Sequence, residues 1–243
     1  RLGAVEAANR FMLATVKIYM NQTERALAEA LASASLAQKV GQSRAEIVSR
    51  LTAGWILVSM DDTAAAQWQV DRGLELAGKL GAKRFEPFLK ETVARIRLQE
   101  GRTGEAAEIA EAALAQLREL DAMSFIGPWL LSTVALTTPD AARRAEVLAE
   151  GEARLQAGSV GHNYFRFHCH AMEANANVGN WDEVRRHADL LATYTANEPT
   201  PWSEFFIARA YAMADAADGR DATARLRALR SQAEAAELRT AIP

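Results

Sequence analysis

Apolar residues recur at helical spacing along almost the whole chain, and short polar or glycine-containing segments interrupt them at regular intervals. The clearest unit runs from Phe85 to Leu120, with an amphipathic segment at 88–99, a tight turn at 100–103 and an alanine-rich segment at 104–120. Residues three and four positions apart share one face of a helix, so each segment predicts an α-helix with one core-facing side. Together the two segments predict an antiparallel helical hairpin.

The same pattern recurs before and after this unit, and the whole chain is rich in alanine, which favours helix by intrinsic propensity. We therefore predict an all-α fold of about six helical hairpins in one domain over residues 1–243. The predicted hairpins lie at about 4–41, 43–81, 84–121, 123–157, 161–196 and 199–238.

Several local signals predict where helices begin. Ser43 and Glu46 have the spacing of a capping box, in which each side chain satisfies a free backbone amide at the helix start. The segment 61–63 offers cap oxygens for the next helix. At the start of the eighth helix, Thr138 is expected to be the cap, Pro139 the first helical residue and Asp140 an acid in the first turn. Thr200-Pro201 predicts the start of the eleventh helix in the same way.

Mostly small residues recur every 40 positions, at the points where the two helices of each hairpin would cross. On the first helices these are Ala14, Gly54, Ala94, Met172 and Ala212, and on the second helices Ala26, Ala66, Ala106, Val184 and Ala224. The interval from Ala94 to Met172 is 78 rather than 80 residues, so the fourth hairpin is slightly short. Within it Pro128 either sets the helix start or bends the helix, and a hinge between two halves of the array is one hypothesis for this place.

A hairpin of this size cannot bury its apolar stripe alone, so neighbouring hairpins must stack on one another. This predicts an α-α superhelix whose first helices line a concave side. The segment 101–107, with Ala113-Leu114 after it, resembles the second half of a tetratricopeptide repeat, and 179–181 resembles its turn. That family repeats at 34 residues and this chain at about 40. HEAT-type repeats match the length but usually have a proline-bent first helix, which most units here lack.

Three further segments, 161–165, 179–183 and 201–209, occur in a succession that resembles the C-terminal region of bacterial adenylate/guanylate cyclase-like proteins. Those proteins join a class III cyclase domain, an AAA-type ATPase and a tetratricopeptide array. The resemblance implies that this chain is a fragment of a longer multidomain signalling protein. We expect no enzyme activity in the fragment itself, because it has neither a Gly-x-x-x-x-Gly-Lys phosphate loop nor a cyclase-type pair of metal-binding carboxylates.

Composition narrows the function further. The 28 basic and 31 acidic residues are mixed along the chain and give a net charge of -3, so we expect no nucleic-acid partner. The longest apolar run, 53–58, is far below the roughly 20 residues of a membrane span. The single cysteine cannot form an internal disulfide and fits a reducing compartment. We expect a cytoplasmic protein that is not bound to a membrane.

Four residues near the start of the ninth helix invite a metal hypothesis: His162, His168, Cys169 and His170. At about 100° per residue, His168 and His170 point to nearly opposite sides of a helix, so we predict no metal and no cofactor. Cys169 is expected to be a packed, inert thiol and His187 a surface residue. The arginines of the second helices either form a stripe for an acidic partner or are balanced by neighbouring acids.

The concave side is the best candidate for a binding site. Repeat-family groove positions, carried over through the 40-residue phase, are Phe11, Thr15, Tyr19, Trp55, Glu91, Arg95, Arg166, Glu173, Asn177 and Arg209. Exposed aromatic side chains beside charges suit a protein or peptide partner, or a small-molecule effector. The alternative is that these aromatics pack between repeats. In that case the array is a structural spacer or an oligomerisation arm without a groove ligand.

Overall fold

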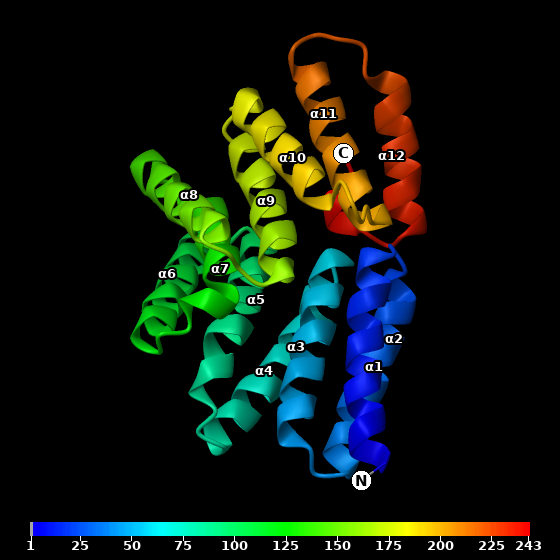
Figure 1. Cartoon of the computed structure of the whole chain (residues 1–243), viewed down its shortest axis with the longest axis vertical. Coiled ribbons are helices and arrows are strands. Elements are labelled where there is room, and N and C mark those ends of the chain that lie inside the picture. The colour runs from blue at the N-terminus through cyan, green and yellow to red at the C-terminus, as the bar shows by residue number, and fades with distance from the viewer. Residues whose placement is uncertain (1) are drawn as a thin grey trace.

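The computed structural model describes residues 2–243, which form twelve α-helices and two short 3₁₀ helices and contain no strand (Figure 1). Most helices pack mainly on their neighbours in sequence, an arrangement compatible with a helical repeat solenoid. The elements are α1 (Leu2–Tyr19), α2 (Thr23–Lys39), α3 (Ser43–Ser59), α4 (Thr63–Lys79), η1 (Lys83–Phe85), α5 (Glu86–Gln99), α6 (Thr103–Glu119), α7 (Met123–Thr137), α8 (Ala141–Gln156), α9 (Gly161–Ala176), α10 (Trp181–Thr195), α11 (Pro201–Ala217), α12 (Thr223–Ala235) and η2 (Arg239–Ala241).

A left-handed residue ends each of the first six helices. This conformation turns the chain and lets the following amides cap the last carbonyls of the helix, as when Gln22 N donates to Lys17 O at 2.9 Å. Glycine, asparagine and aspartate tolerate this conformation best, which explains the residue types found there. The six residues have φ between 50° and 75° and lie 20 positions apart: Asn21, Gly41, Asp61, Gly81, Gly101 and Asp121.

The predicted helix starts are only partly right. Asp62 caps α4 by accepting from Ala65 N, and Thr200 caps α11 in a capping box with Ser203. The predicted box at Ser43 is wrong, because Ser43 already lies inside α3. The Glu46 carboxylate is instead 2.8 Å from the Arg50 guanidinium one turn later.

The fourth hairpin also differs from the prediction. Asp140, not Thr138, is the cap of α8, accepting from the amides of Ala142 and Arg143. Pro128 lies inside α7 and does not start the helix, and it is buried beside a continuous core. The helix after the short hairpin, α9, packs mainly on α7 rather than on α8.

The crossing positions read from the sequence are buried in nine cases out of ten. At Gly54 an added Cβ would lie 2.8 Å from Val70 Cγ2, which shows how closely α3 and α4 approach. The exception is Ala224, which is exposed on α12.

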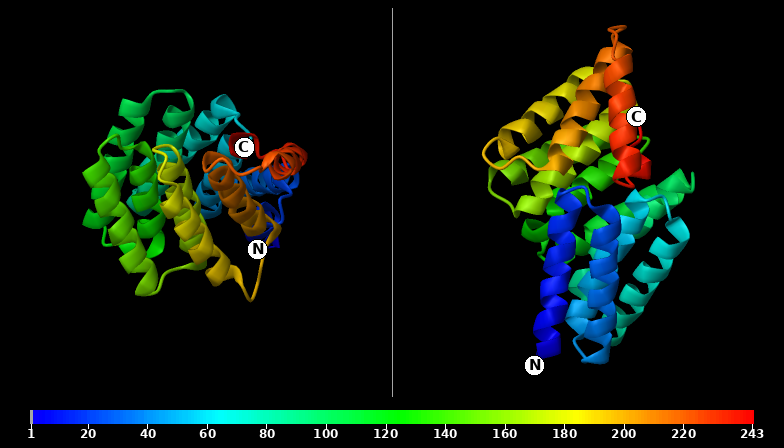
Figure 2. Two further views of the ribbon diagram at one scale, coloured as in Figure 1. Left: turned by 90° about the horizontal axis from the view of Figure 1, so that it is seen from above. Right: turned by 90° about the vertical axis from the view of Figure 1, so that its right-hand side faces the viewer.

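The array curves until its two ends meet. The last hairpin stands over the ends of the first helices (Figure 2), where α11 contacts α1 and η2 contacts α3. The Thr240 hydroxyl donates to the Ser59 carbonyl at 3.4 Å. One hydrophobic core runs from α3 to α9, and a second joins α1, α2 and α3 to α9, α10 and α11. The first helices of the hairpins therefore surround a common interior instead of an open groove.

On the outer side, arginines of the second helices pair with acids of neighbouring hairpins. Arg143 lies 2.7 Å from Glu111, and Arg186 lies 2.6 Å from Glu152. This supports balanced helix faces over a free basic stripe on those helices, although each exposed pair contributes little to stability. Among residues 2–243, none of the helices combines the length and apolar character that crossing a bilayer requires.

Candidate binding sites

Side chains from all six first helices meet in the interior, in a group that we call the axial cluster. It consists of Tyr19 (α1), Trp55 (α3), Glu91 and Arg95 (α5), Trp129 (α7), Arg166 and His170 (α9) and Trp202 (α11). A core this rich in charge is unusual, because each buried charge must be compensated by neighbours.

Arg166 is at the centre of the axial cluster. Its guanidinium carbon lies 3.3 Å from the ring centroid of Trp55, 5.1 Å from that of Trp202 and 5.4 Å from that of Trp129. The residue is 6% exposed, and burial lowers its pKa to about 10, so it remains charged at neutral pH. Within residues 2–243 its Nε has no hydrogen-bond partner and no carboxylate forms an ion pair with it. The aromatic faces supply most of its compensation.

A hydrogen-bonded chain runs beside Arg166. Arg95 can only donate, so the His170 Nε2 that it contacts accepts, and the proton of neutral His170 lies on Nδ1. That nitrogen is 3.3 Å from the hydroxyl oxygens of both Ser132 and Thr133, and Thr133 donates to Glu91 at 3.0 Å. Burial raises the pKa of Glu91 and lowers that of His170 well below its usual value. This series of hydrogen bonds connects Arg95 to the Glu91 carboxyl group through the neutral side chains of His170 and Thr133.

The structure brings five of the ten predicted groove residues into the axial cluster: Tyr19, Trp55, Glu91, Arg95 and Arg166. Glu173 and Arg209 line a cavity of about 20 Å³ beside Cys169, which has room for one water molecule. Phe11 and Asn177 are not part of either group; Phe11 is half-buried on α1, with its carbonyl accepting from Thr15, and Asn177 is exposed at the end of α9.

The aromatic side chains of the axial cluster pack against one another rather than facing solvent. Tyr19 lies 5.8 Å from Trp202 and 4.7 Å from Phe165, and Trp55 lies 5.4 Å from Trp129. The expectation of an open concave groove therefore fails for these residues, because the curvature of the array closes the groove. Sequence analysis missed Trp129 because the short fourth hairpin interrupts the 40-residue phase.

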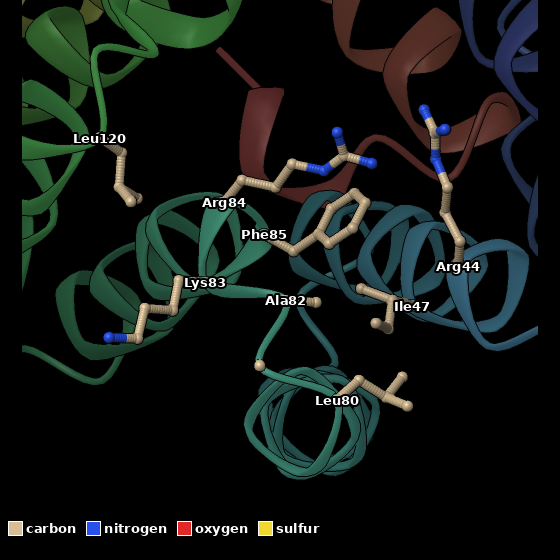
Figure 3. Close-up of a pocket in the computed structure, with 9 residues that line it drawn as sticks. Arg44, Ile47, Leu80, Ala82, Lys83, Arg84, Phe85 and Leu120 are labelled. Atoms are coloured by element: carbon tan, nitrogen blue, oxygen red, sulfur yellow. The ribbon is translucent and has the colours of Figure 1, made fainter.

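A second site, which we call the basic pocket, opens at the turn between α4 and α5 and has a volume of about 490 Å³ (Figure 3). Its floor is apolar, formed by Ile47, Leu80, Ala82, Phe85 and Leu120, and its rim carries Arg44, Lys83 and Arg84. Arg44 and Arg84 extend to the same side, whereas Lys83 points away from them. The Arg84 guanidinium lies 4.9 Å from the Phe85 ring centroid.

The three rim cations are exposed, and none of them forms an ion pair anywhere in the described chain 2–243. Arg44 and Arg84 are 40 residues apart, so they occupy equivalent positions in successive hairpins. The repeat phase could have revealed this pair, but the sequence analysis applied that phase only to the concave side.

No protein-family model matches this chain, and no curated protein matches it. The resemblance to cyclase-like proteins therefore depends on the sequence motifs alone.

A buried histidine pair joins α9 to α10. His187 is fully buried, so its assignment to the surface was wrong, and its Nδ1 lies 3.1 Å from Nδ1 of His168. Across residues 2–243 no cluster of three or more metal-binding side chains occurs. Cys169 is buried and free, and burial raises its pKa, so its thiol remains protonated.

Proposed function

We propose that this chain is a non-catalytic binding module that holds an acidic segment of a protein partner in the basic pocket. One observation carries the proposal: Arg44, Lys83 and Arg84 lie at the rim of an apolar floor, and within residues 2–243 no carboxylate pairs with them. Elsewhere on the outer surface, arginines such as Arg143 and Arg186 have acidic partners. Unpaired cations beside an apolar depression suit a ligand that carries both negative charge and an apolar side chain.

The chemistry of the rim defines the partner segment. A leucine- or phenylalanine-sized side chain can enter the pocket over Phe85, while carboxylates next to it reach Arg44 and Arg84. Guanidinium groups bind carboxylates with two parallel hydrogen bonds, which adds geometric selectivity. We therefore expect the segment to combine glutamate or aspartate with a large apolar residue.

The wider context is also part of the proposal. The 40-residue phase and the tetratricopeptide-like turns support six repeats of a superhelical array. The three motif segments support a sensory, regulatory or scaffold role within a cytoplasmic bacterial signalling protein that carries a cyclase or ATPase domain. In such a protein the array would position a partner relative to the enzyme domain.

A second candidate function is structural, and a specific observation favours it. Tyr19, Trp55 and Arg166 fill the axis of the array and tie its first helices to its last, as a rigid spacer or oligomerisation arm requires. A small effector would reach Arg166 only if α11 moved away from α1.

Binding can be tested with a fluorescein-labelled peptide that alternates glutamate with leucine or phenylalanine, measured by fluorescence anisotropy. The Arg44→Glu/Arg84→Glu variant should bind at least about tenfold more weakly, because two charge-assisted contacts become repulsions. Added salt should weaken wild-type binding as well. Arg25→Glu is the matched control, since Arg25 is an exposed arginine of α2 without an ion pair.

A peptide with glutamine in place of glutamate should bind poorly. Equal affinities of the two peptides, or an equal effect of Arg25→Glu and the double variant, would show that the pocket does not select acidic segments. The structural candidate would then be favoured.

A further inference from the structure

The turns after the first three hairpins repeat one surface pattern. The C-cap residue of each second helix is apolar and at least partly exposed, and these residues lie 40 positions apart: Val40, Leu80 and Leu120. Leu80 and Leu120 both line the basic pocket. The pocket is therefore one unit of a row that follows the turns between hairpins, along an edge of the array and not across a face on which hairpins stack.

The next unit of this row differs from the basic pocket in charge and in exposure. Arg44 and Arg84 occupy equivalent positions, but the position 40 residues after Arg84 holds Ser124. Phe85 is buried, with the Arg84 guanidinium 4.9 Å from its ring centroid. The equivalent Phe125 lies in the first turn of α7 and is 53% exposed. The row thus passes from a charged pocket to an uncovered aromatic ring.

Phe125 belongs to a group that we call the aromatic platform, formed by Phe88, Phe125 and His162. The Phe125 ring centroid lies 5.7 Å from that of Phe88 and 5.5 Å from that of His162. The Phe125 carbonyl accepts from Nε2 of His162 and from Nδ2 of Asn163, both at 2.9 Å, which fixes the first turn of α7 on α9. Burial lowers the pKa of His162, so its ring is neutral at pH 7. The platform is a preorganised surface without charge.

The aromatic platform adjoins the basic pocket. Phe88 lies three residues after Phe85, which lines the pocket, and Leu120, another lining residue, lies five residues before Phe125. Lys83 is on the same side of the pocket as Leu120 (Figure 3). A ligand that leaves the pocket on this side passes Lys83 and then reaches the Phe125 ring.

The charge along this path changes sign. Arg44 and Arg84 make the pocket end positive, whereas Leu120 is flanked in the chain by Glu119 and Asp121. Both acids are exposed, and within residues 2–243 neither of them forms an ion pair. A segment that complements the whole path is therefore acidic at the pocket end and basic at the platform end.

We propose that the acidic segment held in the basic pocket continues along this path and places a second large apolar side chain on Phe125. This inference rests on the proposed function, because the pocket holds the first part of the segment. Phe85 and Phe125 lie at the starts of α5 and α7, which contact each other, and packed helices lie about 10 Å apart.

This separation determines the spacing of the two apolar anchors. In an extended polyproline II segment, residues i and i+3 point to the same side and lie about 9 Å apart. We therefore expect two large apolar residues three positions apart, with glutamate or aspartate beside the first and lysine or arginine beside the second.

Fluorescence anisotropy with two labelled peptides tests the proposal. Both carry glutamates beside a first phenylalanine, and three positions on, the one-anchor peptide has alanine and the two-anchor peptide has a second phenylalanine. The two-anchor peptide should bind the wild type at least about tenfold more tightly, because a second aromatic side chain is buried. Phe125→Ala should remove this advantage. The same variant should bind the one-anchor peptide as the wild type does, which also shows that it is folded.

Trp68→Ala is the matched control, because Trp68 is similarly exposed (56% against 53%). It lies on α4, about 18 Å along the helix from Leu80, so its loss should leave the binding of both peptides unchanged.

An exchange of charge tests the direction of the path. A two-anchor peptide with lysine beside the second anchor should bind about two- to fivefold more tightly than one with glutamate there, as expected for exposed charge pairs. Glu119→Gln/Asp121→Asn should remove this preference. An unchanged preference in that variant would place the second anchor away from Leu120 and overturn the proposed path.

The proposal is also overturned if the two-anchor peptide binds no more tightly than the one-anchor peptide, or if its advantage persists in Phe125→Ala. In either case, glutamate-dependent binding of the one-anchor peptide would still support the basic pocket. If neither peptide binds, or if glutamine replaces glutamate without loss of affinity, the proposed function fails and this inference fails with it. The two failures are therefore distinguishable.

Discussion

Replacing Arg166 with methionine should distinguish a functional role of the axial cluster from a purely structural one. Methionine is unbranched and flexible, so it can follow the path of the arginine stem against Trp55 and Trp202 without a clash. The change removes a buried charge and keeps the packing. Glu91 loses little, because Arg95 attracts it more strongly than Arg166 does.

The expected magnitude follows from two opposing effects. Burial lowers the pKa of Arg166 from 12.5 to about 10, which corresponds to a penalty of about 3 kcal/mol for the charged form. A desolvated guanidinium over a tryptophan face recovers about 2 kcal/mol. Arg166→Met should therefore increase the free energy of unfolding by about 1 kcal/mol and raise the Tm by roughly 2–4 °C for a chain of this size.

Thermal and urea denaturation at neutral pH measure this directly, with exposed Arg25→Met as a control that should change stability by less than about 0.5 kcal/mol. A rise in Tm would mean that the chain keeps the guanidinium at the expense of stability, as proteins do at functional sites. If Arg166→Met instead lowers the Tm by more than about 5 °C, the reasoning is refuted. Arg166 would then be a structural element that closes the array.

The remaining predictions concern packing and pH. Gly151→Ala should destabilise the fold by about 1–3 kcal/mol, because its Cβ would lie 2.1 Å from a Phe167 ring carbon. Gly78 has open space around it, so Gly78→Ala should increase the free energy of unfolding by up to about 1 kcal/mol. If urea denaturation shows the same effect for Gly78→Ala and Gly151→Ala, the close packing of α8 on the Phe167 ring of α9 is contradicted. Burial lowers the pKa of His168 to about 3 and that of His187 to about 4. Unfolded histidine titrates near 6.5, so stability should be complete above that pH and fall by about 2 kcal/mol per histidine by pH 5. His187→Leu should lose less between pH 7 and pH 5, and an unchanged loss would count against the buried pair.

Local signals were sufficient for the elements of the fold. Helical periodicity and turn residues such as Gly41 and Asp61 act within a few positions of themselves, so the order of helices and most turns could be read directly. The errors at Ser43 and Thr138 are small for the same reason, since the true caps lie one or two residues away. Nine of ten crossing positions were buried as expected because a tight hairpin needs small residues there whatever surrounds it.

The candidate site depended on contacts that no local pattern encodes. Concave-side positions were correctly grouped around Trp55, Glu91 and Arg166, because the repeat phase determines which residues share a side of the array. Whether that side is open depends on curvature, which sums small rotations between many hairpins. His187 shows the same limit, since its burial requires α9 to pack over α10.

The sequence by itself determined an all-α array of hairpins, its 40-residue phase and the side of each helix that faces inward. Only the tertiary structure decided that the ends meet, with Thr240 reaching Ser59 across 181 positions. That closure fills the groove with Tyr19 and Trp202 and leaves the basic pocket accessible. The physical reason is that helices and turns are set by interactions between near neighbours, whereas closure depends on the cumulative geometry of twelve packed helices.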